Sequence, residues 1–122
     1  MPVTSAVRDR CRALLRQGEE IRYVFPALSI GPPGVANFLI VVTDRSVSVL
    51  ATRMLRNDRP VSLYAAFPRA TRLGPITMAP SPVIQVGEMF FEFDEEYAAV
   101  VAAADAEVFD PELLPLDPLP EL

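Results

Sequence analysis

Alternating apolar and polar residues predict that the middle of the chain is built from β-strands. In residues 20–25, Ile21, Tyr23 and Phe25 are separated by other side chains with the period of two that is typical of a half-buried strand. The same period recurs in residues 61–67. Proline lacks the N–H that a central ladder needs, so we expect the first of these strands to end at Pro26 and the second at Pro68.

A hairpin is predicted between these two strands. Residues 38–42 are an unbroken apolar run of strand length, and residues 47–54 return after a turn at residues 43–46. Residues 29–37 include the run Gly-Pro-Pro-Gly, whose residue types are strong turn formers. We therefore expect residues 29–37 to form a loop.

The remaining apolar segments complete a count of seven strands. Residues 83–86 and 89–93 flank Gly87, and they read as a second hairpin. A further short strand is expected within residues 72–77, interrupted by Gly74-Pro75. Antiparallel hairpins with few helical crossovers indicate a curved sheet or a small barrel.

Two helices are predicted to flank the strands. Residues 4–17 place Thr4 or Ser5 at an N-cap position, and Gly18 can end the helix. The helix is amphipathic and basic, so it either packs its apolar face on a core or lies on a membrane surface. That face consists of Val7, Cys11, Leu14 and Leu15.

The second helix is predicted over residues 95–108. Asp94 suits its N-cap, and Glu95 and Glu96 in the first turn favour the helix dipole. One apolar stripe should be buried against the sheet, formed by Tyr97, Val101, Ala104 and Val108. Four prolines follow, so we expect residues 109–122 to be an acidic, proline-rich segment that is extended or disordered.

These elements predict a β-rich α+β domain over residues 1–108. The expected architecture is a seven-stranded antiparallel bent sheet, or partly open barrel, with an N-terminal helix and a C-terminal capping helix. At 122 residues and 51% apolar composition, the chain has enough material for one domain with its own core. No apolar run reaches the roughly 20 residues needed to cross a bilayer. With one cysteine and no visible secretory signal, we expect a cytoplasmic protein.

Charge is distributed unevenly. The formal net charge is −5, all 11 basic residues are arginine, and residues 86–122 carry acidic residues without a base. Such a segment is typical of an interaction tail or of a segment that keeps a protein soluble. The acidic balance argues against nucleic acid as a partner.

Residue types that usually carry catalysis are scarce. The absence of histidine removes the commonest general base and the commonest zinc ligand. Cys11 lies on the apolar face of the first predicted helix, where a thiol is inert. The acidic residues 92–96 can bind a cation or simply cap a helix, and their spacing matches no known metal loop. We therefore expect no enzymatic activity, cofactor or metal site.

Three residues are candidates for contacting a partner. Arg69 and Arg72 lie three positions apart after a predicted strand, where they can receive a carboxylate or phosphate. They can equally pair with Glu95, Glu96 or the acidic tail. Tyr64 can line a groove or pack on the face of the sheet.

Four strings along the chain bear on its family: Gly18-Glu19-Glu20, Val41-Val42-Thr43-Asp44-Arg45, residues 68–75 with the sequence PRATRLGP, and Ala103-Ala104-Asp105. With the order of elements, these strings resemble the bacterial pleckstrin-homology-like (PH-like) domains, in particular small actinobacterial members. The resemblance covers about residues 15–108. It implies a binding scaffold without a cofactor. In phosphoinositide-binding relatives, basic residues surround the first interstrand loop. Residues 28–37 contain none, so no such headgroup is expected here.

The resulting expectation is a non-enzymatic scaffold that binds a protein or peptide or associates with itself. A bent sheet offers an edge to which an extended segment can add. The alternative is peripheral binding to a membrane or anionic lipid through the basic N-terminal helix and Arg69 and Arg72.

Overall fold

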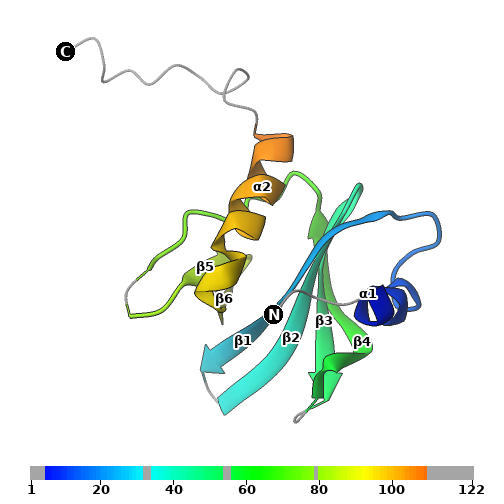
Figure 1. The fold of residues 1–122 in the computed structure, drawn as a ribbon, viewed down its shortest axis with the longest axis horizontal. Coiled ribbons are helices and arrows are strands. Elements are labelled where there is room, and N and C mark those ends of the chain that lie inside the picture. The colour runs from blue at the N-terminus through cyan, green and yellow to red at the C-terminus, as the bar shows by residue number, and fades with distance from the viewer. Residues whose placement is uncertain (1–4, 32–33, 54–55, 79, 110–122) are drawn as a thin grey trace.

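The computed structural model describes residues 5–31, 34–53, 56–78 and 80–109. Within these residues the chain forms six strands, two α-helices and one 3₁₀ helix, η1 (Figure 1). In chain order the elements are α1 (Ser5–Arg12), β1 (Ile21–Gly31), β2 (Gly34–Thr43), β3 (Ser46–Arg53), β4 (Arg56–Pro68), β5 (Val83–Val86), β6 (Met89–Glu92), η1 (Glu95–Tyr97) and α2 (Ala98–Val108).

The strands form one curled antiparallel sheet in the order β4-β3-β2-β1-β6-β5. Strand β1 pairs with β2 along its length and with β6 only at Leu28 and Ser29. The sheet curls so that α2 lies across its open side, whereas α1 lies on the other side of β1–β4 (Figure 1). The β-rich α+β architecture with two flanking helices is therefore confirmed.

The predicted seventh strand is absent from the described residues. Segment 72–77 contributes only an isolated bridge between Thr77 and Val83. The backbone N–H groups of Leu73 and Gly74 donate to the two carboxylate oxygens of Asp105, at 2.8 Å each. Because these donors are directed at α2, and Pro75 has no N–H, the segment cannot form a regular ladder.

The expected end of the first strand and the expected loop were also wrong. Pro26 lies inside β1 opposite Leu39, and the pairing continues to Gly31 opposite Gly34. Residues 29–31 and 34–37 of the predicted loop therefore belong to strands β1 and β2, and residues 32 and 33 lie outside the described residues. Proline is tolerated at this point because β6 does not pair with β1 at Pro26, so that side of the ladder does not require its N–H.

The larger apolar core fills the space between the curled sheet and α2. Phe25 packs against Phe93 and Tyr97, with ring centroids 5.6 and 6.3 Å apart. Val101 and Ala104 of α2 belong to the same cluster. Together with Tyr97, three of the four residues of the predicted helical stripe are therefore buried there. Val108, the fourth, is partly exposed.

Both ends of the C-terminal helical segment agree with the prediction. Asp94 caps the preceding 3₁₀ turn, where its carboxylate accepts a hydrogen bond from the Glu96 N–H at 3.0 Å. Helix α2 ends at Val108, and Phe109 donates its N–H to the Asp105 carbonyl. Residues 110–122 lie outside the described residues, so the predicted boundary of the domain and the extended tail stay predictions.

A smaller apolar cluster lies on the other face of the sheet, under α1. Val7 and Cys11 pack on a patch formed by Ile21, Val24, Leu39, Val41 and Leu50. Helix α1 ends at Arg12, five residues before the predicted end. Leu14 and Leu15 follow in hydrogen-bonded turns and still pack against the cluster.

Candidate interaction surface

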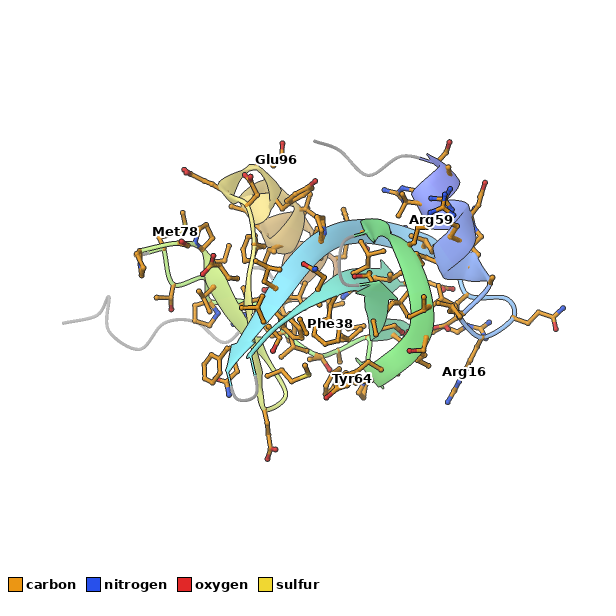
Figure 2. All side chains as sticks on the ribbon, turned by 90° about the horizontal axis from the view of Figure 1, so that it is seen from below. Arg16, Phe38, Arg59, Tyr64, Met78 and Glu96 are labelled. Carbon is orange, nitrogen blue, oxygen red and sulfur yellow. The ribbon has the colours of Figure 1, made fainter. Side chains whose placement is uncertain are left out.

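Strand β4 forms one edge of the sheet and carries exposed apolar side chains. Among the described residues, no strand pairs with its outer side. Val61, Leu63 and Tyr64 are 48, 45 and 60% exposed, although large apolar side chains usually lie inside a domain. The Tyr64 ring lies edge-on against Phe38, with centroids 5.1 Å apart (Figure 2). Tyr64 therefore combines one packed edge with a large exposed surface.

The exposed part of β4 carries no charge. Residues 61–67 have the sequence VSLYAAF, with Arg59 and Pro60 before them and Pro68 and Arg69 after them. The register of β4 against β3 shifts between Val49 and Leu50 and again after Ala51. These irregularities explain why residues of an alternating strand pattern become exposed on both faces, since each shift changes which side chains face the core.

The opposite edge, β5, is built differently. It has four residues, and two of these, Ile84 and Val86, are buried. At its beginning, Thr77 and Val83 exchange two backbone hydrogen bonds of 2.9 and 2.8 Å. Shortness and this bridge protect β5, whereas neither device protects β4.

Arg69 is mostly buried at the C-terminal end of α2. Its side chain is 13% exposed, and Nη2 donates to the Ala104 carbonyl at 2.8 Å and lies 3.4 Å from Glu107 Oε1. Nη1 is buried and has no hydrogen-bond partner among the described residues. The guanidinium therefore holds the last turn of α2 to the end of β4. Its acidic neighbour is Glu107 rather than Glu95 or Glu96.

Arg72 lies on the outer side of the same region. Its Nε is 3.9 Å from Asp105 Oδ2, and its guanidinium lies over the Phe109 ring at 5.5 Å. The Arg72 side chain is 57% exposed. It borders a groove of about 390 Å³ between α2 and the segment after β4, whose walls also include Pro75, Ile76, Val101 and Asp105.

The three candidate residues thus occupy two places. Arg69 and Arg72 meet at the end of α2, around Asp105 and Glu107, whereas Tyr64 belongs to the exposed part of β4. Glu107 also accepts a hydrogen bond of 2.6 Å from the Tyr23 hydroxyl. This bond lowers the pKa of Glu107 and, together with burial, raises the pKa of Tyr23. Of the three candidates, Arg72 and Tyr64 present most surface to a partner.

A second surface feature, which we call the β4 pocket, lies beside β4 on the α1 side of the sheet. Its volume is about 360 Å³. Apolar side chains of β4 form one wall, the segment after α1 forms another, and the turn between β2 and β3 forms the third. The lining residues are Leu15, Arg16, Gln17, Glu19, Arg45, Ser46, Ser48, Leu63, Ala66, Phe67 and Pro68.

Glu19 organises the polar side of the β4 pocket. Its Oε1 accepts hydrogen bonds from Thr43 Oγ1 at 2.8 Å and Ser46 Oγ at 2.7 Å, and its Oε2 accepts from the Arg16 N–H at 3.2 Å. Burial acts to raise the pKa of the Glu19 carboxyl. The hydrogen bonds from Ser46, Thr43 and Arg16 outweigh burial, so the pKa lies below its ordinary value.

Sequence patterns did not identify this pocket. Arg16, Arg45 and Leu63 come from three segments that are distant in the chain, and only the fold brings them together. The alternation of residues 61–67 indicated a strand with one buried face, and it gave no sign that Val61 and Leu63 are exposed. The one available signal was the lack of charge on a strand bounded by two prolines.

Cys11 and the acidic residues 92–96 are the sequence-predicted candidates for metal binding or reactivity. In the described parts of the chain, no group of three or more cysteine and acidic side chains is arranged to hold a metal ion. Cys11 is fully buried, and burial raises the pKa of its thiol to about 11. Asp94 serves as a helix cap. Helix capping therefore accounts for Asp94, one of the acidic residues before α2.

Comparisons with known proteins assign no function to this chain, so a proposed function has to rest on the fold and the site. The chain matches no family model, and no curated protein or solved structure is significantly similar to it. None of the helices described here is both long enough and apolar enough to cross a membrane.

Proposed function

We propose that this chain is a non-enzymatic PH-like scaffold that binds an extended segment of a protein, or a second copy of itself, at the β4 edge. The observation that carries the proposal is the uncharged stretch 61–67, with Val61, Leu63 and Tyr64 exposed, on a strand whose outer side is unpaired among the described residues. The curled antiparallel sheet and the helix across its open side are compatible with a PH-like fold.

The physical argument concerns the unpaired edge. An edge strand presents a row of backbone N–H and C=O groups, and natural proteins usually protect it with charges, prolines or short length. Here Pro60 and Pro68 bound the exposed stretch but do not interrupt it. An added strand would gain main-chain hydrogen bonds, and Leu63 and Tyr64 would contact its side chains.

The membrane alternative receives less support. It requires α1 and the pair Arg69 and Arg72 to face one surface. However, α1 lies on the opposite side of the sheet from α2, where both arginines are located (Figure 1). The Arg69 guanidinium is also mostly buried and already bound to α2. We therefore retain a protein or peptide as the proposed partner, in a cytoplasmic setting, without a role for nucleic acid.

The proposal can be tested with a peptide that copies residues 59–68. We expect it to bind the full-length chain and to slow hydrogen exchange at the amides of β4, because it would supply the missing ladder. Tyr64→Lys should weaken binding at least about tenfold, since edge lysines oppose strand addition. Gln85→Lys on the β5 edge is the matched control and should bind as the unmodified chain does.

Self-association is measured in the same series by light scattering over a range of chain concentrations. A dimer that Tyr64→Lys dissociates and Gln85→Lys preserves would identify a second copy as the partner. If the peptide leaves the β4 amides unchanged and the chain remains monomeric at high concentration, the β4 edge is not a binding site and the proposal is wrong.

A further inference from the structure

The β4 pocket combines an apolar wall with a basic rim. Leu63, Ala66 and Phe67 form the wall contributed by β4. Arg16 and Arg45 both line the pocket and are exposed, and Figure 2 shows Arg16 extending outward from the segment after α1. Glu19 also lines the pocket, but its two carboxylate oxygens already accept hydrogen bonds. The pocket is thus suited to an apolar side chain flanked by acidic groups.

This chain contains a segment of that chemistry. Residues 110–122, with the sequence DPELLPLDPLPEL, include four acidic residues, five leucines, four prolines and no base. Its prolines disfavour a helix or a central strand, and proline-rich segments lose little entropy when they bind a groove in an extended form. Acidic groups at intervals between leucines complement a pocket that has arginines at its rim.

The fold brings the start of this segment to the same end of the sheet as the pocket. Arg69 binds the Ala104 carbonyl of α2, and Pro68, the preceding residue, lines the pocket and pairs with Ser46. Thirteen residues beyond Phe109 can span at most about 45 Å when fully extended. The segment is therefore long enough to pass from the end of α2 to the other face of the sheet.

The groove beside Phe109 fits this segment less well. Among the described residues that line it, Arg72 is the only basic one, and its guanidinium lies near the Asp105 carboxylate, which also lines the groove. Asp105, like Glu19, already accepts hydrogen bonds at both carboxylate oxygens, so the two sites differ in their arginines rather than in their carboxylates. In the β4 pocket, Arg45 likewise lies 3.9 Å from the Asp44 carboxylate. The described lining of this pocket adds a second exposed arginine, Arg16, and this extra charge makes the pocket more complementary to an acidic segment than the groove is.

We propose that residues 110–122 bind the β4 pocket of the same chain, with a leucine against Leu63 and Ala66 and with acidic side chains beside Arg16 and Arg45. Tethering gives such a segment an effective concentration on the order of millimolar, so weak contacts suffice. This inference does not depend on strand addition at β4, because the residues that the segment would contact, Leu63 and Ala66, lie on the α1 face rather than at the backbone edge.

A spin label on the segment tests the contact in the full-length chain. Pro118→Cys supplies the attachment point, and the buried Cys11, with its thiol pKa of about 11, should not react near neutral pH. We expect the amide signals of Ser46, Leu63 and Ala66 to lose most of their intensity relative to the reduced label. Added salt should restore part of it, because exposed charge pairs are screened.

Charge reversal provides the matched variants. Arg16→Glu combined with Arg45→Glu should restore the intensities, whereas Arg59→Glu, which changes an exposed arginine outside the pocket, should not. The positions of the remaining amide signals show that each variant is folded. Unbroadened signals in the unmodified pocket, or broadening at Ile76 and Ala102 instead, would overturn the proposal.

A mixed sample distinguishes the same chain from a second copy. Spin-labelled chains without isotope are combined with isotope-labelled chains that carry no spin label. The proposal predicts no broadening in this mixture. Broadening at Ser46 and Leu63 in the mixture would show that the segment enters the pocket of another molecule, and the intramolecular assignment would then be wrong.

Discussion

Both helices of this domain bury one face against the sheet, yet they are attached to it in different ways. Helix α2 buries Val101 and Ala104 in the larger core, and polar contacts hold it near its C-terminal end. Asp105 accepts two backbone N–H groups, Arg69 donates to the Ala104 carbonyl, and Glu107 accepts from Tyr23. Helix α1 covers a smaller cluster with Val7 and Cys11, and its ion pair between Arg12 and Asp9 joins two exposed residues of the helix itself.

The difference shows what an apolar stripe does and does not determine. Burial of apolar area drives the packing of both helices. In α1 the apolar stripe decides which face is buried, whereas α2 is apolar around most of its surface, so its stripe alone does not select the face with Val101 and Ala104. The long-range polar contacts decide how precisely α2 is placed, because each one fixes a position and a direction. We therefore expect substitutions under α2 to cost more stability than similar substitutions under α1.

The largest effect is expected from Val101→Asp. Val101 is 1% exposed, so the substitution removes a core contact and buries an unpaired charge. The expected cost is about 4 kcal/mol or more, out of the roughly 5–15 kcal/mol that stabilise a domain. Chemical denaturation should show the unfolding midpoint at a much lower denaturant concentration than in the unmodified chain. The exposed Ala99→Asp on the same helix is the control and should change stability by less than about 1 kcal/mol.

A second, smaller effect is expected from Asp105→Ala. The substitution leaves the N–H groups of Leu73 and Gly74 without their acceptor, which costs about 2–3 kcal/mol in partly buried surroundings. Asp105→Asn keeps one acceptor oxygen and should recover part of the loss. Faster hydrogen exchange at Leu73 and Gly74 would accompany the destabilisation. Equal stability of all three proteins would contradict the anchoring role.

The same substitution, valine to alanine, made in each helix compares the two apolar clusters directly. Val101→Ala should destabilise by about 2–3 kcal/mol, and Val7→Ala by about 1–1.5 kcal/mol. Val7 is 7% exposed and belongs to a helix of only eight residues, so the surroundings can relax into the vacated space. Thermal melts of the two variants measure the difference. An equal loss in both would mean that α1 is held as firmly as α2.

The features that the sequence predicted well depend on neighbours in the chain. The cap at Asp94, the stripe on α2 and the hairpin turn at Gly87 each follow from local rules about side-chain spacing and backbone preference. The bounds of the first two strands were predicted less well. Pro26 lies inside β1 because β6 does not pair with β1 at that point, and this arrangement cannot be read from the neighbouring residues. Segment 72–77 was misassigned because its N–H groups bind Asp105, more than 30 residues away in the sequence.

The candidate interaction surface also contains one feature that the sequence indicated and others that it did not. Tyr64 was identified as a possible contact residue because aromatic side chains at strand positions can line grooves, and it is exposed. The exposure of Val61 and Leu63 depends on register shifts against β3, which no pattern in residues 61–67 reveals. The β4 pocket depends on three separate segments meeting, and the proximity of Arg16 to Arg45 follows only from the tertiary structure.

The smallest effect is expected at Glu19, which links the segment after α1 to the turn between β2 and β3. Its pKa is lower in the folded chain than in the unfolded chain, so ionised Glu19 stabilises the fold above the unfolded pKa of about 4.3. That contribution is lost as the pH falls through the lower, folded pKa. Glu19→Gln should therefore reduce stability near neutral pH by less than about 1 kcal/mol, and the difference should shrink below pH 4. Denaturation curves over this range, with the exposed Glu88→Gln as control, would reveal it. A difference that grows in acid would mean that burial, rather than the bonds from Thr43 and Ser46, dominates at Glu19.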